Sequence, residues 1–375
     1  MDMSAITPSS MQLNKLKWET TTEYNTGLDA TFLKGKLRFT VDVYQKYVKD
    51  LLQPKVKMPT TIGYGNGYQI SYMNSGKMTN KGWEFRVDAV PFQNKDWRVG
   101  VYFNIAHNEN KITEMPDNYI EENYTFGNGN YAYRREEGRP MGSFYGYRYK
   151  GVYQNKDATY ARDIEGNVMK DISGNAIVMR NGSYTVAPGD AIYEDVNHDG
   201  VINQYDIVYL GNSNPRLTGG AGLNVSYKQF KLSAIFYGRY GQDVVNATRL
   251  NNESMRGIDN QSTAVLRRWR NEGDQTDIPR ALYGEGYNTL GSDRFVEDAS
   301  YLRLKSLSFT YRLPKKAIQR WGFNNIDVYV TGYNLFTWTK YTGQDPEVKT
   351  ENTYARDTAT TPASIQLVAG FNLSF

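Results

Sequence analysis

Apolar residues recur at every second position in several stretches of this chain, which is the pattern of a β-strand with one apolar face. A clear example runs from Leu37 to Val43, where apolar side chains alternate with Arg38, Thr40 and Asp42. Matching the chain to this template predicts about nine strands. They cover residues 28–32, 37–43, 83–89, 97–105, 223–227, 232–236, 302–311, 326–330 and 365–375.

Short polar turns separate three pairs of these strands, as in β-hairpins. These turns are Lys34–Lys36, Asn94–Asp96 and Lys228–Gln229. The apolar phase also shifts by one residue after Leu304, which predicts a β-bulge near Lys305 and Ser306. A moderate connection, residues 313–325, contains Pro314.

The remaining connections are long, and they alternate with the short ones. They cover residues 48–80, 109–218, 241–298 and 338–363. Outer-membrane β-barrels have short periplasmic turns and long extracellular loops. The pattern therefore predicts an all-β, antiparallel transmembrane β-barrel in which the last strand ends at Phe375 on the periplasmic side.

Nine strands do not make a complete bacterial barrel, because single-chain barrels of this type have even strand numbers. Open sheet edges are not tolerated in lipid, so further strands are needed to pair with the first and the last. We therefore expect residues 1–375 to be the C-terminal portion of a longer protein. Residues 1–10 also lack the charged and apolar regions of a signal peptide, although an outer-membrane protein is exported through one.

The composition is compatible with a barrel, although only 39% of the residues are hydrophobic. No apolar run reaches the roughly 18 residues that a membrane helix needs, whereas a barrel strand needs about ten residues with every second one apolar. A soluble β-sandwich or propeller would show the same alternation. The alternating loop lengths and the aromatic terminal residue favour a membrane barrel. A propeller would show a repeat of about 40 residues, and the sequence has none.

Charge and residue content exclude several functions. The chain has no cysteine, so disulfides, thiolate metal sites and cysteine nucleophiles are ruled out. The net charge is +4 and no basic stripe suggests nucleic-acid binding. Of the two histidines, His107 is the candidate base of a membrane-embedded hydrolase, but no Ser or Asp lies near it at a spacing that would indicate a catalytic nucleophile. We predict a rim residue and no catalytic site.

One segment matches a calcium-binding loop. Residues 195–200 fit the D-x-[DN]-x-[DN]-G pattern. Calcium prefers oxygen ligands, and the loop offers them at regular spacing. The predicted ligands are Asp195, Asn197, Asp199, Val201 through its carbonyl, and Asp206. The alternative is a turn stabilised by its own Asp and Asn side chains.

Two further loop segments carry recognisable features. The run Phe144, Tyr145, Tyr147 and Tyr149 is either a platform on which sugar rings or peptides stack, or a hairpin packed on itself. The stretch Ser262–Trp269 predicts a short capped helix.

The segment Asn74–Glu84 (NSGKMTNKGWE) resembles the N-x-G-x-x-x-N-K-G-x-E motif of SusC-like, TonB-dependent outer-membrane transporters. Other segments resemble signatures of the same family in the same order. They are Trp18–Thr22, Gly138–Tyr147, Gly189–Asp190, Gly211–Pro215, Val265–Trp269, Thr276–Arg280, Ser300–Lys305 and Gly332–Thr337.

The resemblance implies a barrel of 22 strands with an N-terminal plug, to which this chain contributes the last nine strands. It implies TonB-driven import of oligosaccharides, glycans or peptides together with a SusD-like lipoprotein. Phe371, Leu373 and Phe375 resemble the signal that the barrel-assembly machinery reads. A non-transporting barrel or surface adhesin is the alternative.

Overall fold

The computed structural model describes residues 16–57, 69–74, 76–115, 130–133, 135–351 and 354–375. Nine long strands dominate these residues, and all nine predicted strands are present. They are β1 (Thr20–Phe32), β2 (Leu37–Lys49), β5 (Lys77–Gln93), β6 (Trp97–Glu114), β14 (Leu217–Tyr227), β15 (Phe230–Tyr240), β18 (Tyr301–Arg312), β19 (Asn325–Thr339) and β22 (Gln366–Ser374).

Several long strands extend further toward the long loops than the alternation predicts. For example, β5 begins at Lys77 rather than at residue 83, and β6 continues to Glu114. These extensions carry polar residues on both faces, and a search for alternating apolar residues misses them. Part of the predicted loop 109–218, residues 116–129 and 134, lies outside the described residues.

The chain divides into two compact units. The first comprises Met1–Ala89, Tyr102–Glu122 and Arg135–Met141, and the second comprises Val90–Val101, Asn123–Arg134 and Gly142–Phe375. The hairpin of β5 and β6 contributes to both. In the first unit the strand order is β1-β2-β5-β6, with antiparallel pairing of β1 to β2 and of β2 to β5.

The first unit has one apolar and one charged sheet face. The register places Leu28, Val41 and Phe85 in one row, so that apolar side chains from three strands share a face. The next row consists of Gly27, Asp42 and Glu84 and belongs to the opposite face, because successive side chains of a strand point to opposite sides.

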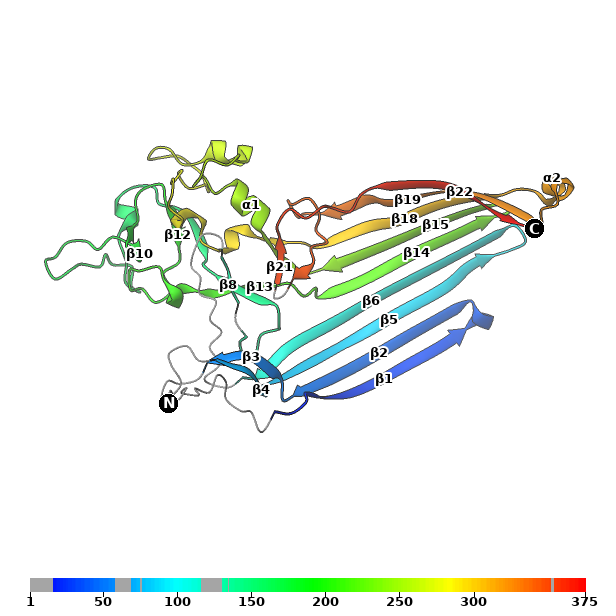
Figure 1. The fold of residues 1–375 in the computed structure, drawn as a ribbon, viewed down its shortest axis with the longest axis horizontal. Coiled ribbons are helices and arrows are strands. Elements are labelled where there is room, and N and C mark those ends of the chain that lie inside the picture. The colour runs from blue at the N-terminus through cyan, green and yellow to red at the C-terminus, as the bar shows by residue number, and fades with distance from the viewer. Residues whose placement is uncertain (1–15, 58–68, 75, 116–129, 134, 352–353) are drawn as a thin grey trace, which may run out of the picture. The chain divides into compact units, whose positions relative to one another are not determined.

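In the second unit the strand order is β6-β14-β15-β18-β19-β22, and these strands lie side by side in Figure 1. One row across five strands consists of Val225, Leu232, Phe309, Val330 and Ala369. The neighbouring row is polar, with a hydrogen bond between the Ser308 and Thr331 hydroxyls at 2.7 Å. The same division into an apolar and a polar face thus recurs.

The predicted β-bulge is confirmed. The pairing of β15 with β18 leaves out Lys305, since Ile235 faces Ser306 and the next residue, Phe236, faces Leu304. The pairing of β18 with β19 shifts at the same place.

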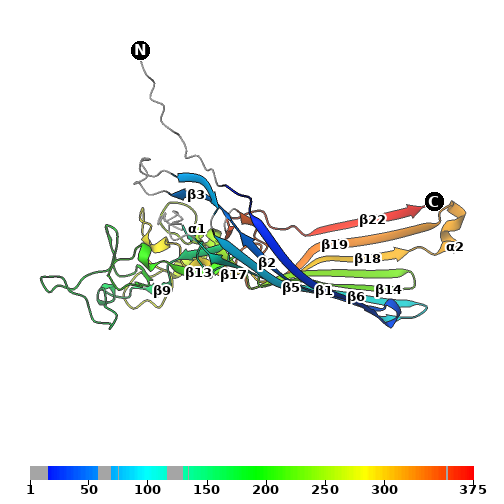
Figure 2. The ribbon, with the colours of Figure 1, turned by 90° about the horizontal axis from the view of Figure 1, so that it is seen from below.

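The C-terminus lies at the end of the second unit where the short turns are (Figures 1 and 2). Phe375 packs against Phe323 of the β18–β19 connection, with ring centroids 5.1 Å apart. The backbone N–H of Lys228 in the β14–β15 turn donates to the carbonyl of Asp96 in the β5–β6 turn at 2.8 Å. Phe375 thus lies at the same end of this unit as the short turns, which is the end predicted to be periplasmic.

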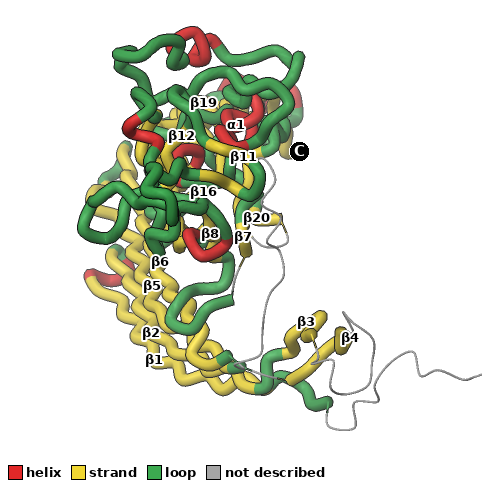
Figure 3. Tube along the Cα trace, turned by 90° about the vertical axis from the view of Figure 1, so that its left-hand side faces the viewer, coloured by secondary structure: helices red, strands yellow, loops and turns green. Residues whose placement is uncertain are grey.

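The long connections of the second unit form folded loops at the other end of its strands, where Figure 3 shows mainly loop and turn. Their short strands are β7 (Ala132–Tyr133), β8 (Ser143–Gly146), β9 (Tyr149–Val152), β10 (Arg180–Asn181), β11 (Tyr184–Thr185), β12 (Ala191–Tyr193), β13 (Val208–Asn212), β16 (Asp243–Asn246), β17 (Val296–Asp298), β20 (Thr350–Glu351) and β21 (Tyr354–Asp357). In the first unit, β3 (Leu52–Lys57) pairs with β4 (Gln69–Asn74).

The helices are short. The α-helices are α1 (Ala247–Asn252) and α2 (Lys315–Ile318), and the 3₁₀ helices are Leu33–Gly35, Asp157–Thr159, Gln204–Asp206, Thr263–Arg267, Tyr287–Thr289, Asp293–Phe295 and Gln319–Trp321. The helix predicted at 262–269 is thus a 3₁₀ helix, capped by the Ser262 hydroxyl. Among the described residues, no helix has both the length and the apolar content that crossing a membrane requires.

Candidate functional site

The polar sheet face of the second unit carries a charged site next to the long loops. Two neighbouring rows build it: Tyr237, Arg303 and Thr337 form one, and Arg239, Tyr301 and Thr339 form the other. The row between them, Gly238, Leu302 and Trp338, belongs to the apolar face, where Leu302 and Trp338 are exposed.

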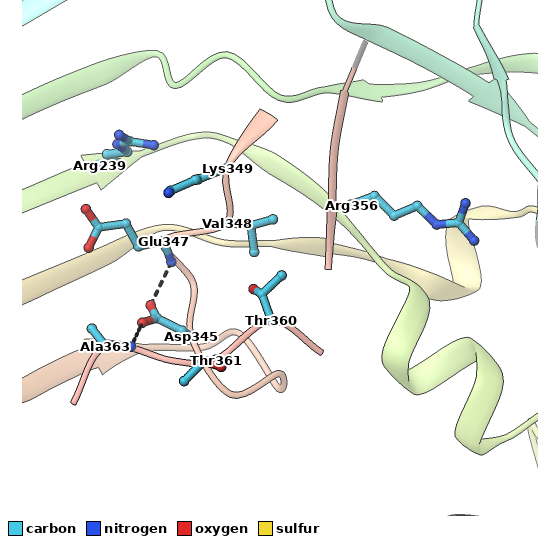
Figure 4. Close-up of a pocket in the computed structure, with 9 residues that line it drawn as sticks. All are labelled: Arg239, Asp345, Glu347, Val348, Lys349, Arg356, Thr360, Thr361 and Ala363. Atoms are coloured by element: carbon cyan, nitrogen blue, oxygen red, sulfur yellow. Dashed lines mark hydrogen bonds between the residues drawn. The ribbon is translucent and has the colours of Figure 1, made fainter. Parts of the chain in front are cut away.

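A pocket of about 790 Å³ opens beside these rows (Figure 4). The end of β15 and the connection between β19 and β22 supply its walls. The lining residues are Arg239, Asp345, Glu347, Val348, Lys349, Arg356, Thr360, Thr361 and Ala363.

Arg303 holds the 345–347 segment of the pocket wall against the sheet. The Arg303 side chain is only 3% exposed, and its guanidinium donates to Asp345 and, at 2.8 Å, to Glu347. Its Nε donates to the Thr337 hydroxyl at 2.8 Å. A buried guanidinium that serves two carboxylates ties the 345–347 segment to the sheet.

The Asp345 carboxylate is held in its charged form. Burial opposes its ionisation, but the backbone N–H of Ala363 and the guanidinium of Arg303 together lower the pKa of Asp345 below its usual value. The same carboxylate accepts the backbone N–H groups of Ala363 and Glu347, each at 2.9 Å. One ionised side chain thus anchors two segments of the loop.

The rest of the segment rests on an apolar cluster. Val348 packs with other buried residues, and the buried Gln242 side chain donates to the carbonyl of Pro346 at 3.3 Å. The cluster consists of Val244, Ala299, Tyr341, Val348 and Ala355. The pocket is therefore built on a packed foundation.

The polar face of the first unit carries its own pocket of about 460 Å³. Its lining residues are Glu23, Asn25, Asp42, Tyr44, Lys46, Asn80, Glu84 and Asn108. The Tyr44 hydroxyl donates to Asn108 at 3.0 Å, and Lys46 pairs with Glu23 at 3.2 Å.

The structure buries the aromatic run predicted as a stacking platform. Phe144, Tyr145 and Tyr147 are 0–2% exposed. The Tyr149 hydroxyl donates to the carbonyl of Asp277 at 2.6 Å, and the Arg294 guanidinium lies 5.4 Å from its ring centroid. This burial favours the alternative interpretation, in which the rings form the core of the folded loops, because a buried ring offers no face to a ligand.

The predicted calcium loop folds around its own acidic side chains. Asp195 accepts the backbone N–H groups of Asp199 and Gly200 at 3.2 and 2.8 Å, and Asp199 accepts that of Val201 at 2.8 Å. Gly200 has a φ of +79°, which suits the tight turn. Among the residues that the structure describes, no three His, Cys, Asp or Glu side chains converge suitably for a metal, so calcium would also need Asn197 as a ligand.

Asp206 links the two ends of the loop by hydrogen bonds. Its side chain is buried and accepts the backbone N–H groups of Val196 and Asn203, each at 2.8 Å. Burial raises the pKa of Asp206 above its usual value, and the carboxylates of Asp195 and Asp199 add to the shift while the two hydrogen bonds oppose it. A bound cation would relieve this repulsion.

Several signature segments meet in the loops of the second unit. Arg280 forms an ion pair with the buried Asp190 at 2.7 Å, and its backbone N–H donates to the carbonyl of Gly189. A Cβ at Gly189 would lie 2.3 Å from the Trp269 ring. These residues therefore have structural roles in joining distant loop segments.

The other predicted residues lie on strands. His107 lies in β6 with its ring 6.0 Å from that of Trp83. Phe371 and Leu373 of β22 are exposed, and Phe371 shares a row with Val328, as expected for the apolar face.

The charged residues of the large pocket were not predicted from the sequence. Arg239 and Arg303 alternate with apolar neighbours, which assigns them to a polar face but not to a site. The carboxylate partners of Arg303, Asp345 and Glu347, come from a long loop more than 40 residues further along the chain. Only tertiary structure brings these groups together.

Comparison with known proteins yields consistent matches. A family model described as "TonB dependent receptor-like, beta-barrel" matches residues 3–335. TonB-dependent receptor P3 of Formosa agariphila is 32% identical over 346 residues, which cover 90% of this chain and 32% of that protein. TonB-dependent receptor SusC of Bacteroides thetaiotaomicron is 30% identical over 369 residues, or 96% of this chain and 32% of that protein.

Among solved structures, a chain of the RagAB peptide transporter matches with a TM-score of 0.72 and 28% identity. The match covers 96% of this chain and 36% of that chain. This chain thus spans about a third of the length of the relatives it matches.

Proposed function

Because this chain belongs to the TonB-dependent receptor-like β-barrel family, we propose that it forms part of a nutrient importer of the outer membrane. The family is one of outer-membrane receptors and transporters rather than enzymes, in agreement with the predicted absence of catalysis. The resemblance to SusC-like proteins is likewise confirmed.

The observation that carries the proposal is the division of each unit's sheet into an apolar and a polar face. Large apolar side chains are exposed on one face of the second unit, such as Phe309 (46%), Val330 (50%) and Leu367 (74%). Such a surface is unfavourable in water and suited to lipid. The other face carries the charged pocket beside the long loops, where a substrate would enter.

We propose oligosaccharides or peptides as the imported nutrients. The name of the RagAB peptide transporter supports peptides, and the wider resemblance to SusC-like proteins supports glycans. A SusD-like lipoprotein would cover the outer mouth, and TonB would supply the energy.

Deletion of the gene should abolish growth on the imported nutrient, and so should deletion of tonB. Affinity purification of the full-length protein from outer membranes should also recover a lipoprotein. Wild-type growth of the deletion strain on every oligosaccharide and peptide source, with surface attachment lost instead, would favour the adhesin alternative.

Calcium binding at Asp195, Asn197, Asp199, Val201 and Asp206 is a second, structural proposal. The hydrogen bonds that bring Asp195, Asn197 and Asp199 close together in one loop support it. The ion would stiffen the folded loop and take no part in transport chemistry.

A further inference from the structure

We propose that the pocket between β15 and the β19–β22 connection binds a carboxylate group of the imported substrate, held between Arg239 and Lys349. This inference rests on the proposed function, since it assigns a substrate chemistry to the polar face of an importer. The two cations come from different elements: Arg239 is the penultimate residue of β15, and Lys349 follows the anchored segment 345–348.

The two cations are directed at the same space. Figure 4 shows the charged ends of Arg239 and Lys349 on the same side of the pocket, together with the carboxylate of Glu347, whereas Arg356 extends away from them. Like charges that face each other repel, and an anion placed between them turns this repulsion into two attractions. The arrangement thus favours an anionic ligand.

The acidic residues nearby form their ion pairs with other cations, although the Glu347 carboxylate also attracts the Arg239 guanidinium, whose Nε donates to the Tyr237 hydroxyl at 3.2 Å. Glu347 already accepts from Arg303 and from Lys305, each at 2.8 Å, and Asp345 accepts from Arg303. Within the part of the chain that the structure describes, no carboxylate lies within ion-pair distance of Arg239 or Lys349.

A count of charges gives the same result. Three of the lining residues are cationic, Arg239, Lys349 and Arg356, and two are carboxylates, Asp345 and Glu347. Both carboxylates also bind Arg303 or Lys305 outside the lining, so the site as a whole carries an excess of positive charge.

The chemistry of the walls suits a carboxylate on a polar chain. Guanidinium and ammonium groups form charge-assisted hydrogen bonds with carboxylates, and Thr360 and Thr361 add hydroxyl groups. A volume of about 790 Å³ lies within the range of small-ligand sites. None of the nine described lining residues is aromatic, so the walls do not distinguish an acidic peptide from a uronic acid oligosaccharide.

The test is a titration calorimetry experiment on the full-length protein in detergent, with two pairs of probes. One pair is trigalacturonate and its methyl ester; the other is a capped Ala-Glu-Glu-Ala peptide and its Ala-Gln-Gln-Ala counterpart. We expect at least one acidic probe to bind about tenfold or more tightly than its neutral partner. The pair that shows the preference identifies the source of the carboxylate.

Two variants locate the binding. Arg239→Gln and Lys349→Gln should each reduce the preference for the acidic probe about tenfold, and the double variant should abolish it. Lys349 is exposed, so its substitution leaves the fold intact. The matched control is Arg320→Gln with Lys316→Gln in the connection at the opposite end of the strands, which removes the same charge and should leave binding unchanged.

Equal binding of acidic and neutral probes would overturn the proposal, and so would a preference that survives Lys349→Gln combined with Arg239→Gln. Growth assays separate this failure from that of the proposed function. If the wild-type gene supports TonB-dependent uptake while the calorimetry shows no anion preference, only the pocket assignment fails.

Discussion

Close backbone contacts place glycine where a larger residue would not fit. In the first unit, a Cβ at Gly82 would lie 2.3 Å from the carbonyl oxygen of His107 and 2.6 Å from the Tyr44 hydroxyl. Backbone atoms do not give way as a flexible side chain does. Gly82 is also the glycine of the N-K-G-x-E motif, so close packing explains why this position of the motif is a glycine.

We expect Gly82→Ala to lower the free energy of unfolding by about 1–3 kcal/mol, because the added methyl group overpacks the strand pair. Urea titration of the protein in detergent measures this change. Thr31→Ala, at an exposed position of β1, is the control and should change stability little. Equal stability of the two variants would show that the strands adjust to the methyl group.

The ionisation of Asp345 couples the loop to pH. Its pKa is lowered in the folded protein, so its stabilising contribution is present above the usual carboxyl pKa of about 4 and is lost as the pH falls through the folded value. We expect residues 340–349 to exchange their amide hydrogens faster, after correction for intrinsic rates, as the pH falls from about 6 to about 3.

Asp345→Asn should exchange fast at both pH values, since it lacks the charge that binds Arg303. A wild-type loop whose corrected exchange does not change with pH would argue against this role of the carboxylate.

Among the secondary structure elements, β18 illustrates how one strand serves two environments. Phe309 belongs to the exposed apolar row, whereas the adjacent Thr310 faces the other side with Lys231 and Tyr329. The two positions are chain neighbours, so a comparison between them isolates the effect of the face.

Phe309→Arg should destabilise the folded protein in lipid by about 2 kcal/mol or more, whereas Thr310→Arg should have a small effect. Unfolding in lipid vesicles with guanidinium measures both. Equal effects at the two positions would contradict the assignment of the apolar face to lipid.

The loop 195–206 is held by hydrogen bonds that it makes with itself, and the proposed calcium would add to them. We expect chelation to increase protease cleavage within residues 190–210 several-fold, because the acidic side chains repel each other without a cation. The Asp199→Asn variant should be cleaved as fast as the chelator-treated wild-type protein, whether or not chelator is present. Identical cleavage of the wild-type protein in both conditions would contradict calcium binding.

At the scale of the whole molecule, the outer edges of β1 and β22 need pairing partners. In the first unit β1 pairs with β2, and in the second unit β22 pairs with β19. Among the described residues, neither strand has a partner on its other side. In lipid both edges need partners, because unpaired backbone groups there are costly.

Assembly into the membrane is the step for which the last residue is predicted to matter. Phe375 is 81% exposed and packs only lightly, against Phe323. Phe375→Ala should reduce the amount of folded protein in outer membranes several-fold if the assembly machinery reads this residue. Phe323→Ala removes the same contact and is the control; equal losses in both variants would assign the effect to packing.

The sequence alone determined the nine long strands, the short turns and the bulge at Lys305. Each depends on neighbours within a few residues: a strand with one apolar face alternates with period two, and an inserted residue shifts that period. The family also followed from local motifs, such as the one around Gly82, that are visible without knowledge of the fold.

Only the tertiary structure decided what the charged and aromatic side chains do. The aromatic rings at 144–147 had two interpretations, and packing against distant loop residues placed them in a core. The pocket joins Arg239 and Arg303 to the 345–349 segment, so its charge balance depends on contacts between residues far apart in the chain. Local periodicity assigns such residues to a face of a strand, but the partners that a long loop brings to them depend on the fold.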